Sequence, residues 1–343
     1  MAAFRPGRTL LHCAAIVPVR RSSLLVVGCG DIGMRVLRLV VPRWRALVLT
    51  HTPERIPLLR SLGAVPVSGD LDRPQTLARL ASLASCVLHL APPPPAGVGD
   101  PRTRALVRAL ARTGSVRTLV YASTSGVYGD AGGARIDETR ARAPASARAR
   151  RRADAEDAVR WFGRATGARV SILRVPGIYA VGRPGGDPRE RLRRATPVLA
   201  AAEDVYTNHV HADDLARICV AALVRGRPQR VVHASDDSEL KVGEYFDLAA
   251  DLAGLPRPPR LARSEAALML PAASLEFMAE SRRLDNGRLR RELRVALDYP
   301  TVHAGLAALR DRGASPAPPV GDAAAGQRAQ RRRERPNGDW PRQ

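Results

Sequence analysis

The sequence predicts an α/β fold in which helices cover both faces of a doubly wound parallel sheet, followed by a small, mostly helical C-terminal lobe. Short apolar runs alternate with amphipathic segments over most of the chain from residue 22 onward. The apolar runs are continuous instead of alternating, which is typical of strands buried on both faces. A glycine-rich turn joins the first apolar run to the first amphipathic segment. These three observations favour parallel strand–helix units over an antiparallel architecture.

Each element follows from its local pattern. The continuous apolar runs predict strands at Leu24–Val27, Ala46–Thr50, Ala64–Val67, Cys86–Leu90, Thr118–Ala122, Val170–Arg174 and Arg230–His233. The amphipathic segments predict helices at Gly33–Val41, Pro53–Leu62, Pro74–Leu83, Thr103–Arg112, Ala147–Phe162, Ala212–Val224 and Val242–Ala253. From Pro256 to Arg312 short helical pieces are interrupted by prolines, so we assign this region, with Gly177–Asn208, to the lobe.

The first strand ends in a glycine pattern that is suited to hold a dinucleotide. The run Gly28-Cys29-Gly30-Asp31-Ile32-Gly33 has the spacing G-x-G-x-x-G. Gly28 permits a tight turn, Gly30 lets the backbone approach a pyrophosphate, and Gly33 lets the helix pack on the strand. The N–H groups of the helix start, at Asp31 and Ile32, then face the anion. A plain strand–turn–helix is the alternative, and the amphipathic segment that follows favours cofactor binding.

The end of the second strand favours NADP(H), with NAD(H) as the alternative. A site selective for NAD places Asp or Glu here to accept from the ribose 2′-hydroxyl, but this chain has Thr50-His51, and Arg55 follows. A small hydroxyl and nearby cations suit a 2′-phosphate, although Arg55 could also be a solvated helix-start residue.

The next two strand ends offer further contacts to a dinucleotide. Asp70, before Leu71, could accept from the adenine amino group or serve as an ordinary turn residue. Ala91 and Pro92 would form a rigid wall at the nicotinamide ribose.

The charge of the chain does not indicate a nucleic-acid partner. The formal net charge is +22, but Lys241 is the only lysine and the arginines are spread along every expected helix. Aromatic residues are scarce and do not interleave with the arginine runs, as stacking platforms for bases would require. We therefore expect no specific nucleic-acid binding.

The cysteines and the chain ends predict a cytoplasmic protein with two unstructured extensions. Cys13, Cys29, Cys86 and Cys219 form no C-x-x-C pair, and no apolar run has the length of a membrane span. Residues 1–21 are basic and acid-free; a targeting peptide is conceivable, but a disordered extension is favoured because the first strand follows directly. The expected division is 1–21 extension, 22–175 dinucleotide-binding domain, 176–312 remaining sheet and substrate lobe, and 313–343 disordered basic tail.

The segment after the fifth strand carries a family signature. Thr124 begins a Thr-Ser-Gly-Val-Tyr-Gly-Asp run that ends at Asp130, and related patterns occur at 173–179, 209–216 and 286–300. Over residues 22–312 the chain resembles the extended branch of the short-chain dehydrogenase/reductase superfamily, the NAD-dependent epimerases and dehydratases. The resemblance implies a Rossmann domain with a small substrate lobe, and it implies that Thr124 hydrogen-bonds the reacting oxygen. Pro176, within the 173–179 pattern, is expected beside the cofactor.

The catalytic Y-x-x-x-K pair of that family is missing from this chain. No tyrosine occurs between Tyr128 and Tyr179. An alignment anchored on Glu156 puts Arg148 at the tyrosine position and Arg152 at the lysine position, and a slip of two residues gives Ser146 and Arg150 instead. A guanidinium cannot cycle a proton near neutral pH, but Arg148 or Arg152 could neutralise a phosphate or a substrate oxyanion. The chain thus resembles the atypical subgroups that keep the fold and lose the pair.

Two functions stay open at this level. One is an NAD(P)-dependent oxidoreductase or epimerase-like enzyme for a small polar or sugar-like metabolite, with Thr124 and an unidentified acid or water. The other is a non-catalytic NAD(P)-binding sensor or scaffold. The expected partners are a small-molecule substrate and, as an open question, a second copy in a homodimer, with no membrane. The pattern His209-x-His211 with Asp213-Asp214 is expected to cap a helix, and no metal site is predicted.

Overall fold

The computed structural model describes residues 22–309, apart from the side chains of residues 272 and 273. The expected extension 1–21, the tail 313–343 and Cys13 lie outside the described residues. Within this part of the chain, no helix combines the length and the apolar character that crossing a membrane requires.

A parallel sheet of seven strands forms the centre of the molecule, in the order β12-β7-β5-β4-β1-β2-β3. Its strands are β1 (Ser23–Val27), β2 (Arg45–Thr50), β3 (Val65–Ser68), β4 (Cys86–His89), β5 (Thr118–Thr124), β7 (Arg169–Val175) and β12 (Arg230–His233). Strand β1 pairs in parallel with β2 on one side and with β4 on the other, and the strand order reverses between β1 and β4. In open α/β sheets, ligands bind at the carboxyl ends of the strands at such a reversal.

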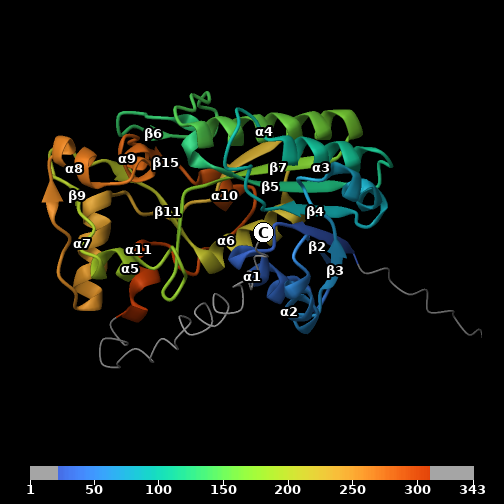
Figure 1. The fold of residues 1–343 in the computed structure, drawn as a ribbon, viewed down its shortest axis with the longest axis horizontal. Coiled ribbons are helices and arrows are strands. Elements are labelled where there is room, and N and C mark those ends of the chain that lie inside the picture. Colours follow the sequence, from blue (N-terminus) through green and yellow to red (C-terminus); the bar gives the residue numbers. More distant parts are fainter. Residues whose placement is uncertain (1–21, 310–343) are drawn as a thin grey trace, which may run out of the picture.

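Helices cover both faces of this sheet, which confirms the expected doubly wound fold (Figure 1). On one face α1 (Asp31–Val40) packs with α6 (Ala212–Arg225), and on the other η2 (Pro74–Ser82), α3 (Pro101–Ala111) and α4 (Ala147–Thr166) pack together. Strand β1 shows why both faces are apolar: Leu24 and Val26 belong to one core cluster, whereas Leu25 and Val27 belong to the other. A short 3₁₀ turn η1 (Pro53–Arg55) and α2 (Ile56–Ser61) connect β2 with β3.

One expected helix has a different geometry. Residues 74–82, where a helix is expected, form a 3₁₀ helix. A 3₁₀ helix places residues i and i+3 on the same face, and Leu77 and Leu80 are both completely buried. The apolar spacing therefore suits either helix, and the pattern alone could not distinguish them.

The C-terminal lobe has its own apolar core and lies at the opposite end of the molecule from β3 (Figure 1). Its helices are α5 (Pro188–Arg193), α7 (Val242–Ala253), α8 (Arg263–Met269), α9 (Ala272–Met278) and α11 (Val302–Leu306). Short two-stranded ladders join β9 (Val198–Leu199) to β14 (Arg260–Leu261) and β10 (Tyr206–Thr207) to β13 (Leu240–Lys241). The exact domain boundaries at 175 and 312 remain predictions.

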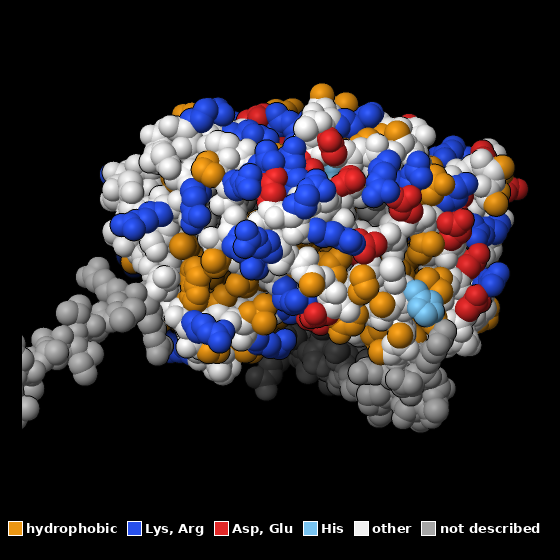
Figure 2. Space-filling model, turned by 180° about the vertical axis from the view of Figure 1, so that it is seen from behind, with side chains coloured by type: hydrophobic (Ala, Val, Ile, Leu, Met, Phe, Trp, Pro, Cys, Tyr) orange, Lys and Arg blue, Asp and Glu red, His pale blue; other side chains and the backbone are white. Residues whose placement is uncertain are grey.

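Further short elements connect the lobe to the sheet. Strand β8 (Gly177–Tyr179) pairs with β11 (His209–His211), β6 (Arg135–Ile136) pairs with β15 (Arg283–Leu284), and α10 (Gly287–Arg291) follows β15. On the face drawn in Figure 2, Lys and Arg side chains are distributed among Asp and Glu side chains instead of forming one continuous patch.

Candidate functional site

A cavity of about 380 Å³ opens at the carboxyl ends of β1, β2, β3 and β4. We call it the glycine-loop cavity. Its walls include eight of the expected cofactor contacts, two after each strand: Gly28, Gly30, Thr50, Arg55, Asp70, Leu71, Ala91 and Pro92. Of the other expected contacts, Asp31, Ile32 and Gly33 form the first turn of α1, and Pro176 lines a neighbouring cavity. The residues selected from separate strand ends therefore lie around one space.

The glycines of the turn have different structural tasks. Gly28 has a φ of +84°, and a Cβ there would lie 2.3 Å from the backbone nitrogen of Ala91. A Cβ on Gly33 would lie 3.1 Å from Sγ of Cys29, so the helix start packs tightly on the turn. A Cβ on Gly30, in contrast, would meet no heavy atom within 4 Å. Gly28 and Gly33 are thus required for close packing within the turn and against the segment after β4. Gly30 instead keeps space open beside the start of α1, as a bound pyrophosphate requires.

The rim of the glycine-loop cavity at β2 is basic. Arg55 donates from Nη2 to the carbonyl oxygen of Cys29 at 2.7 Å, which holds its guanidinium at the cavity. Thr50 accepts from the backbone N–H of Thr52 at 3.2 Å. Arg102 also lines the cavity and binds Asp72, with Nε 2.7 Å from Oδ1, and this bond lowers the pKa of the Asp72 carboxyl. Sequence reasoning missed Arg102 because it reaches the rim from helix α3, after an intervening loop.

A second cavity, of about 310 Å³, lies at the carboxyl end of β5 and contains Thr124. We call it the Thr124 cavity. Oγ1 of Thr124 accepts from the backbone N–H of Gly126 at 3.2 Å and caps the short 3₁₀ turn at 125–128. The hydroxyl hydrogen of Thr124 is therefore available to donate to an oxygen in the cavity. Pro176 also lines this cavity.

The two arginines expected from the family spacing have different surroundings. Helix α4 begins at Ser146, which caps it by accepting from the N–H of Ala149 at 3.1 Å, and both Ser146 and Arg148 line the Thr124 cavity. Burial lowers the pKa of the Arg148 guanidinium, with a smaller effect from Arg152, but a guanidinium still keeps its proton at neutral pH.

Arg152 does not line this cavity. Its Nη1 donates to the carbonyl oxygen of Ala122 at 2.7 Å and to the hydroxyl of Tyr121 at 3.1 Å. The expectation that Arg152 meets a substrate oxygen has no support in this geometry, because the guanidinium is turned toward strand β5. Glu156, the anchor of the alignment, is fully buried and binds Arg174 at 2.8 Å and Ser123 at 2.7 Å.

The two tyrosines considered as replacement acids have their hydroxyl groups elsewhere. The hydroxyl of Tyr128 lies 2.6 Å from Nε2 of His233, and burial raises the pKa of Tyr128 to about 12. Tyr179 donates to the carbonyl oxygen of Thr301 at 3.2 Å. Neither tyrosine lines the Thr124 cavity.

Two carboxyl groups from the lobe do line the Thr124 cavity. Glu280 accepts from Nη1 of Arg282 at 2.8 Å, whereas Glu276 lies on the exposed side of α9 near Arg148. Sequence reasoning missed both, because no local pattern relates them to β5, more than a hundred residues earlier in the chain.

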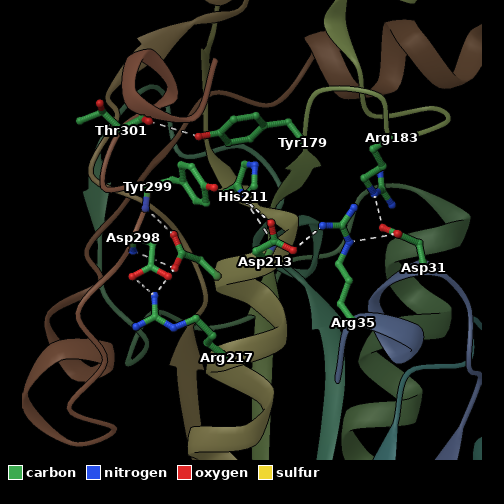
Figure 3. A network of polar contacts seen from close by, with 11 residues as sticks. Asp31, Arg35, Tyr179, Arg183, His211, Asp213, Arg217, Asp298, Tyr299 and Thr301 are labelled. Carbon is green, nitrogen blue, oxygen red and sulfur yellow. Dashed lines mark hydrogen bonds and ion pairs between the residues drawn. The ribbon is translucent and has the colours of Figure 1, made fainter. Parts of the chain in front are cut away.

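A network of ion pairs joins the glycine turn to the lobe (Figure 3). Asp31 binds Arg183, from the loop between β8 and α5, at 2.8 Å, and it binds Arg35 at 3.0 Å. Arg35 also pairs with Asp213. The Asp31 carboxylate therefore lies between two cations, so its charge is compensated at the anion-binding end of α1.

The His-Asp cluster lies at the other side of the same network. Nδ1 of His211 accepts from the N–H of Asp213 at 3.3 Å and caps α6. Asp214 accepts from the N–H groups of Asp298 and Tyr299 at 2.9 and 2.8 Å. In the described part of the chain, no group of His, Cys, Asp and Glu is arranged to hold a metal ion.

Comparison with known proteins gives the family. The model of the NAD dependent epimerase/dehydratase family matches residues 25–234. The chain belongs to this family. The match confirms the resemblance to extended short-chain dehydrogenases, which are enzymes that use a nicotinamide cofactor. No curated protein matches the sequence.

Solved structures with the same fold cover most of the chain. A functionally unknown conserved protein from Silicibacter pomeroyi DSS is 29% identical, with a TM-score of 0.72, over 84% of this chain and 98% of that one. UDP-glucose 4-epimerase from Thermotoga maritima is 19% identical, with a TM-score of 0.68, over 84% and 97%. UDP-glucuronic acid 4-epimerase from Bacillus cereus, solved with NAD, is 17% identical, with a TM-score of 0.67, over 85% and 98%.

Proposed function

We propose that the protein is an NAD(P)-dependent oxidoreductase or epimerase-like enzyme that acts on a small polar or sugar-like metabolite. The observation that carries this proposal is the arrangement of the two cavities along one edge of the parallel sheet. The glycine-loop cavity lies at the strand-order reversal, and the Thr124 cavity lies at the end of β5, next to β4. A bound nicotinamide cofactor would supply or accept a hydride at this edge.

The chain's own residues would hold the cofactor through its phosphates and its adenosine half. The open space at Gly30 and the N–H groups of Asp31 and Ile32 suit a pyrophosphate. Arg55 would bind a 2′-phosphate, since Thr50-His51 stands at the end of β2 where an NAD site has a carboxylate, and this supports NADP(H) over NAD(H). Asp70 would accept from the adenine amino group.

Two side chains that line the Thr124 cavity, Thr124 and Arg148, could donate hydrogen bonds to a reacting oxygen. The Thr124 hydroxyl would donate one hydrogen bond, and the Arg148 guanidinium would stabilise the negative charge that develops on that oxygen. Neither group replaces the missing tyrosine as a proton carrier, because Arg148 stays charged. We assign that task to Glu276, since Glu280 is already bound by Arg282.

The epimerases of similar fold support only the general substrate class. Their names give UDP-sugars as their substrates. Identities of 17% and 19% support a shared fold and not a shared substrate. A polar, hydroxylated metabolite agrees with the polar lining of the Thr124 cavity.

Calorimetric titration of the full chain with NADPH and NADH tests the cofactor part. We expect binding of both and tighter binding of NADPH. Turnover is then tested by following nicotinamide absorbance against a panel of hydroxy acids, sugars and sugar nucleotides. Loss of turnover in Glu276→Gln but not in Glu280→Gln would support the proton assignment.

The second candidate is a non-catalytic NAD(P)-binding sensor, which the missing Y-x-x-x-K pair favours. It predicts that NADPH binds while no compound of the panel is converted. It also predicts that NADPH changes the protection of the lobe, residues 177–208, in hydrogen exchange. Absence of binding by either dinucleotide would refute both candidates.

A further inference from the structure

The lobe contains a cavity of its own, of about 300 Å³. We call it the lobe cavity. It lies between the loop after β8, helix α5, the strands β10 and β11, and helix α7. It shares a wall with the Thr124 cavity, made of Gly177, Ile178, Gly185 and Phe277. Its volume is at the lower end of the range of ligand pockets, which suits a molecule of modest size.

Buried polar atoms without a partner cluster in the wall of this cavity. They are Nη2 of Arg191, Oγ1 of Thr207 and Nδ1 of His209. Thr207 and His209 are only 5% and 6% exposed, so bulk water does not solvate them. A buried donor or acceptor without a partner destabilises the fold. Three such atoms around one cavity therefore indicate that a ligand completes their hydrogen bonds.

The balance of charge in the wall favours an anion. Of the two acidic residues of the wall, Asp187 is paired with Arg189 at 2.6 Å, whereas Glu190 accepts from the N–H of Gly185 at 3.1 Å and keeps its charge. Arg191 lies over the ring of Phe246, 4.5 Å from its centroid. Among the described residues, no carboxylate pairs with Arg191 or with Arg194. The cavity therefore presents two guanidinium groups without an ion-pair partner against the single unpaired carboxylate of Glu190, so its wall is positive on balance.

The aromatic part of the wall contains His209, a buried and neutral histidine. His209 stacks on Tyr245 with ring centroids 4.2 Å apart and an angle of 16°. Burial lowers the pKa of His209 to about 3, so its imidazole is neutral at pH 7 and offers one donor and one acceptor. Such a ring suits a hydroxyl group, which can both give and take a hydrogen bond.

We propose that the lobe cavity binds the anionic end of the substrate, a carboxylate or a phosphate monoester, through Arg191 and Arg194. Thr207 and His209 bind an adjacent hydroxyl group, and Phe246 and Phe277 cover the carbon skeleton. This assignment rests on the proposed function, because it requires one molecule to extend from the lobe cavity past the shared residues to Thr124 in the adjacent cavity. An anion held in this way orients the reacting carbon in the Thr124 cavity.

The test uses the full chain and simple probes in isothermal titration: phenyl phosphate, benzoate, the neutral benzyl alcohol and UDP-glucose. We expect one or both of the simple anions to bind saturably, with benzyl alcohol at least about tenfold weaker. The tighter of the two anions identifies the anionic group. NADPH binding is measured separately, so that failure of the cofactor proposal is distinguished from failure of this one.

Matched variants locate the binding. Arg191→Met keeps the apolar stem over Phe246 and removes the charge, so the affinity for the anion falls at least about tenfold. Arg193→Met, an exposed position on the same helix, leaves it unchanged. Thr207→Val should lower the affinity for the anion several-fold. It should not lower the thermal midpoint of unfolding, because the hydroxyl that it removes is buried without a hydrogen-bond partner.

Several results would overturn the assignment. They are equal binding of benzyl alcohol and the anions, equal affinity in Arg191→Met and the wild type, and no binding of either simple anion. Binding of UDP-glucose without binding of either simple anion would likewise overturn the assignment to a small anion. A thermal midpoint lowered by Thr207→Val would show that the hydroxyl has a structural partner instead of a ligand.

Discussion

The glycine-loop cavity and the lobe cavity are built in opposite ways. In the first, nearly all of the wall comes from the ends of strands of one sheet, with Arg102 of α3 added at the rim, and space is left open by backbone that lacks a side chain, as at Gly30. In the second, the walls come from loops, helices and two-residue strands, and side chains such as Arg191 and His209 give the space its chemistry. A site made of backbone can be read from glycine spacing, whereas a site made of side chains depends on tertiary folding.

The largest expected effect is the complete loss of ligand binding at one cavity while binding at the other is kept. Gly30→Asp should abolish dinucleotide binding, because its carboxylate projects toward the pyrophosphate position. The fold should persist, since a Cβ at Gly30 meets no heavy atom within 4 Å. Calorimetry with NADPH and thermal unfolding measure the two effects, and binding of benzoate or phenyl phosphate should be unchanged.

Gly28→Ala is the contrasting control for that experiment. Its Cβ would lie 2.3 Å from the Ala91 nitrogen, and φ is +84°, so the variant should lose stability as well as binding. If Gly30→Asp bound NADPH as tightly as the wild type, the glycine-loop cavity would not be the pyrophosphate site.

Thr124 lines a third cavity, which adjoins the lobe cavity, and its loss should affect chemistry alone. With a converted substrate in hand, Thr124→Val should lower kcat by about a hundredfold, the typical effect of one lost hydrogen bond to developing charge. NADPH affinity should not change. Thr124→Ser keeps both the donor and the cap on the N–H of Gly126 and should restore most of the rate. Equal kcat in Thr124→Val and the wild type would exclude the residue from catalysis.

Buried histidines allow the stability of the two regions to be compared. His89, in the sheet, and His209, in the lobe wall, each have a pKa lowered by burial to about 3. Below pH 6.5 the unfolded chain binds protons that the folded chain does not, so stability is lost as the pH falls. Each histidine should cost about 2 kcal/mol of unfolding free energy at about pH 5 relative to pH 8.

Urea unfolding over this pH range tests the effect in His89→Asn and His209→Asn. Each variant should show a flatter loss of stability toward acid than the wild type. A flatter curve in His89→Asn alone would mean that water in the lobe cavity already solvates His209. An unchanged curve in both would contradict the lowered pKa values.

The smallest expected effect concerns the choice of cofactor. Arg55→Ala should lower the affinity for NADP(H) by about tenfold, because a charge-assisted hydrogen bond to the 2′-phosphate is lost. NAD(H) should bind as before, since it has no 2′-phosphate. Arg60→Ala, on the exposed side of α2, is the matched control. Equal weakening of both dinucleotides would place Arg55 at the shared pyrophosphate instead.

Sequence patterns were sufficient for the sheet because each strand is a continuous apolar run, and the structure has a strand at every expected position. They also located η2 but left its helix type open, because buried Leu77 and Leu80 satisfy two helix geometries. In the site, Arg148 could be found from its distance to Glu156 along one helix. Glu276 and Arg191 could not, because they reach the cavities only through the packing of the lobe.

The arginine at the start of α4 has a consequence for how the protein responds to acidity. A tyrosine–lysine pair works as a titrating device, whose strength changes when one of its protons leaves. Arg148 keeps its proton throughout the pH range in which proteins remain folded, so the positive potential it imposes on the Thr124 cavity is constant. Where a tyrosine–lysine pair would be an adjustable proton source, Arg148 is a permanent electrostatic field, and we expect the pH dependence of chemistry in this cavity to come from its carboxyl groups or from the substrate.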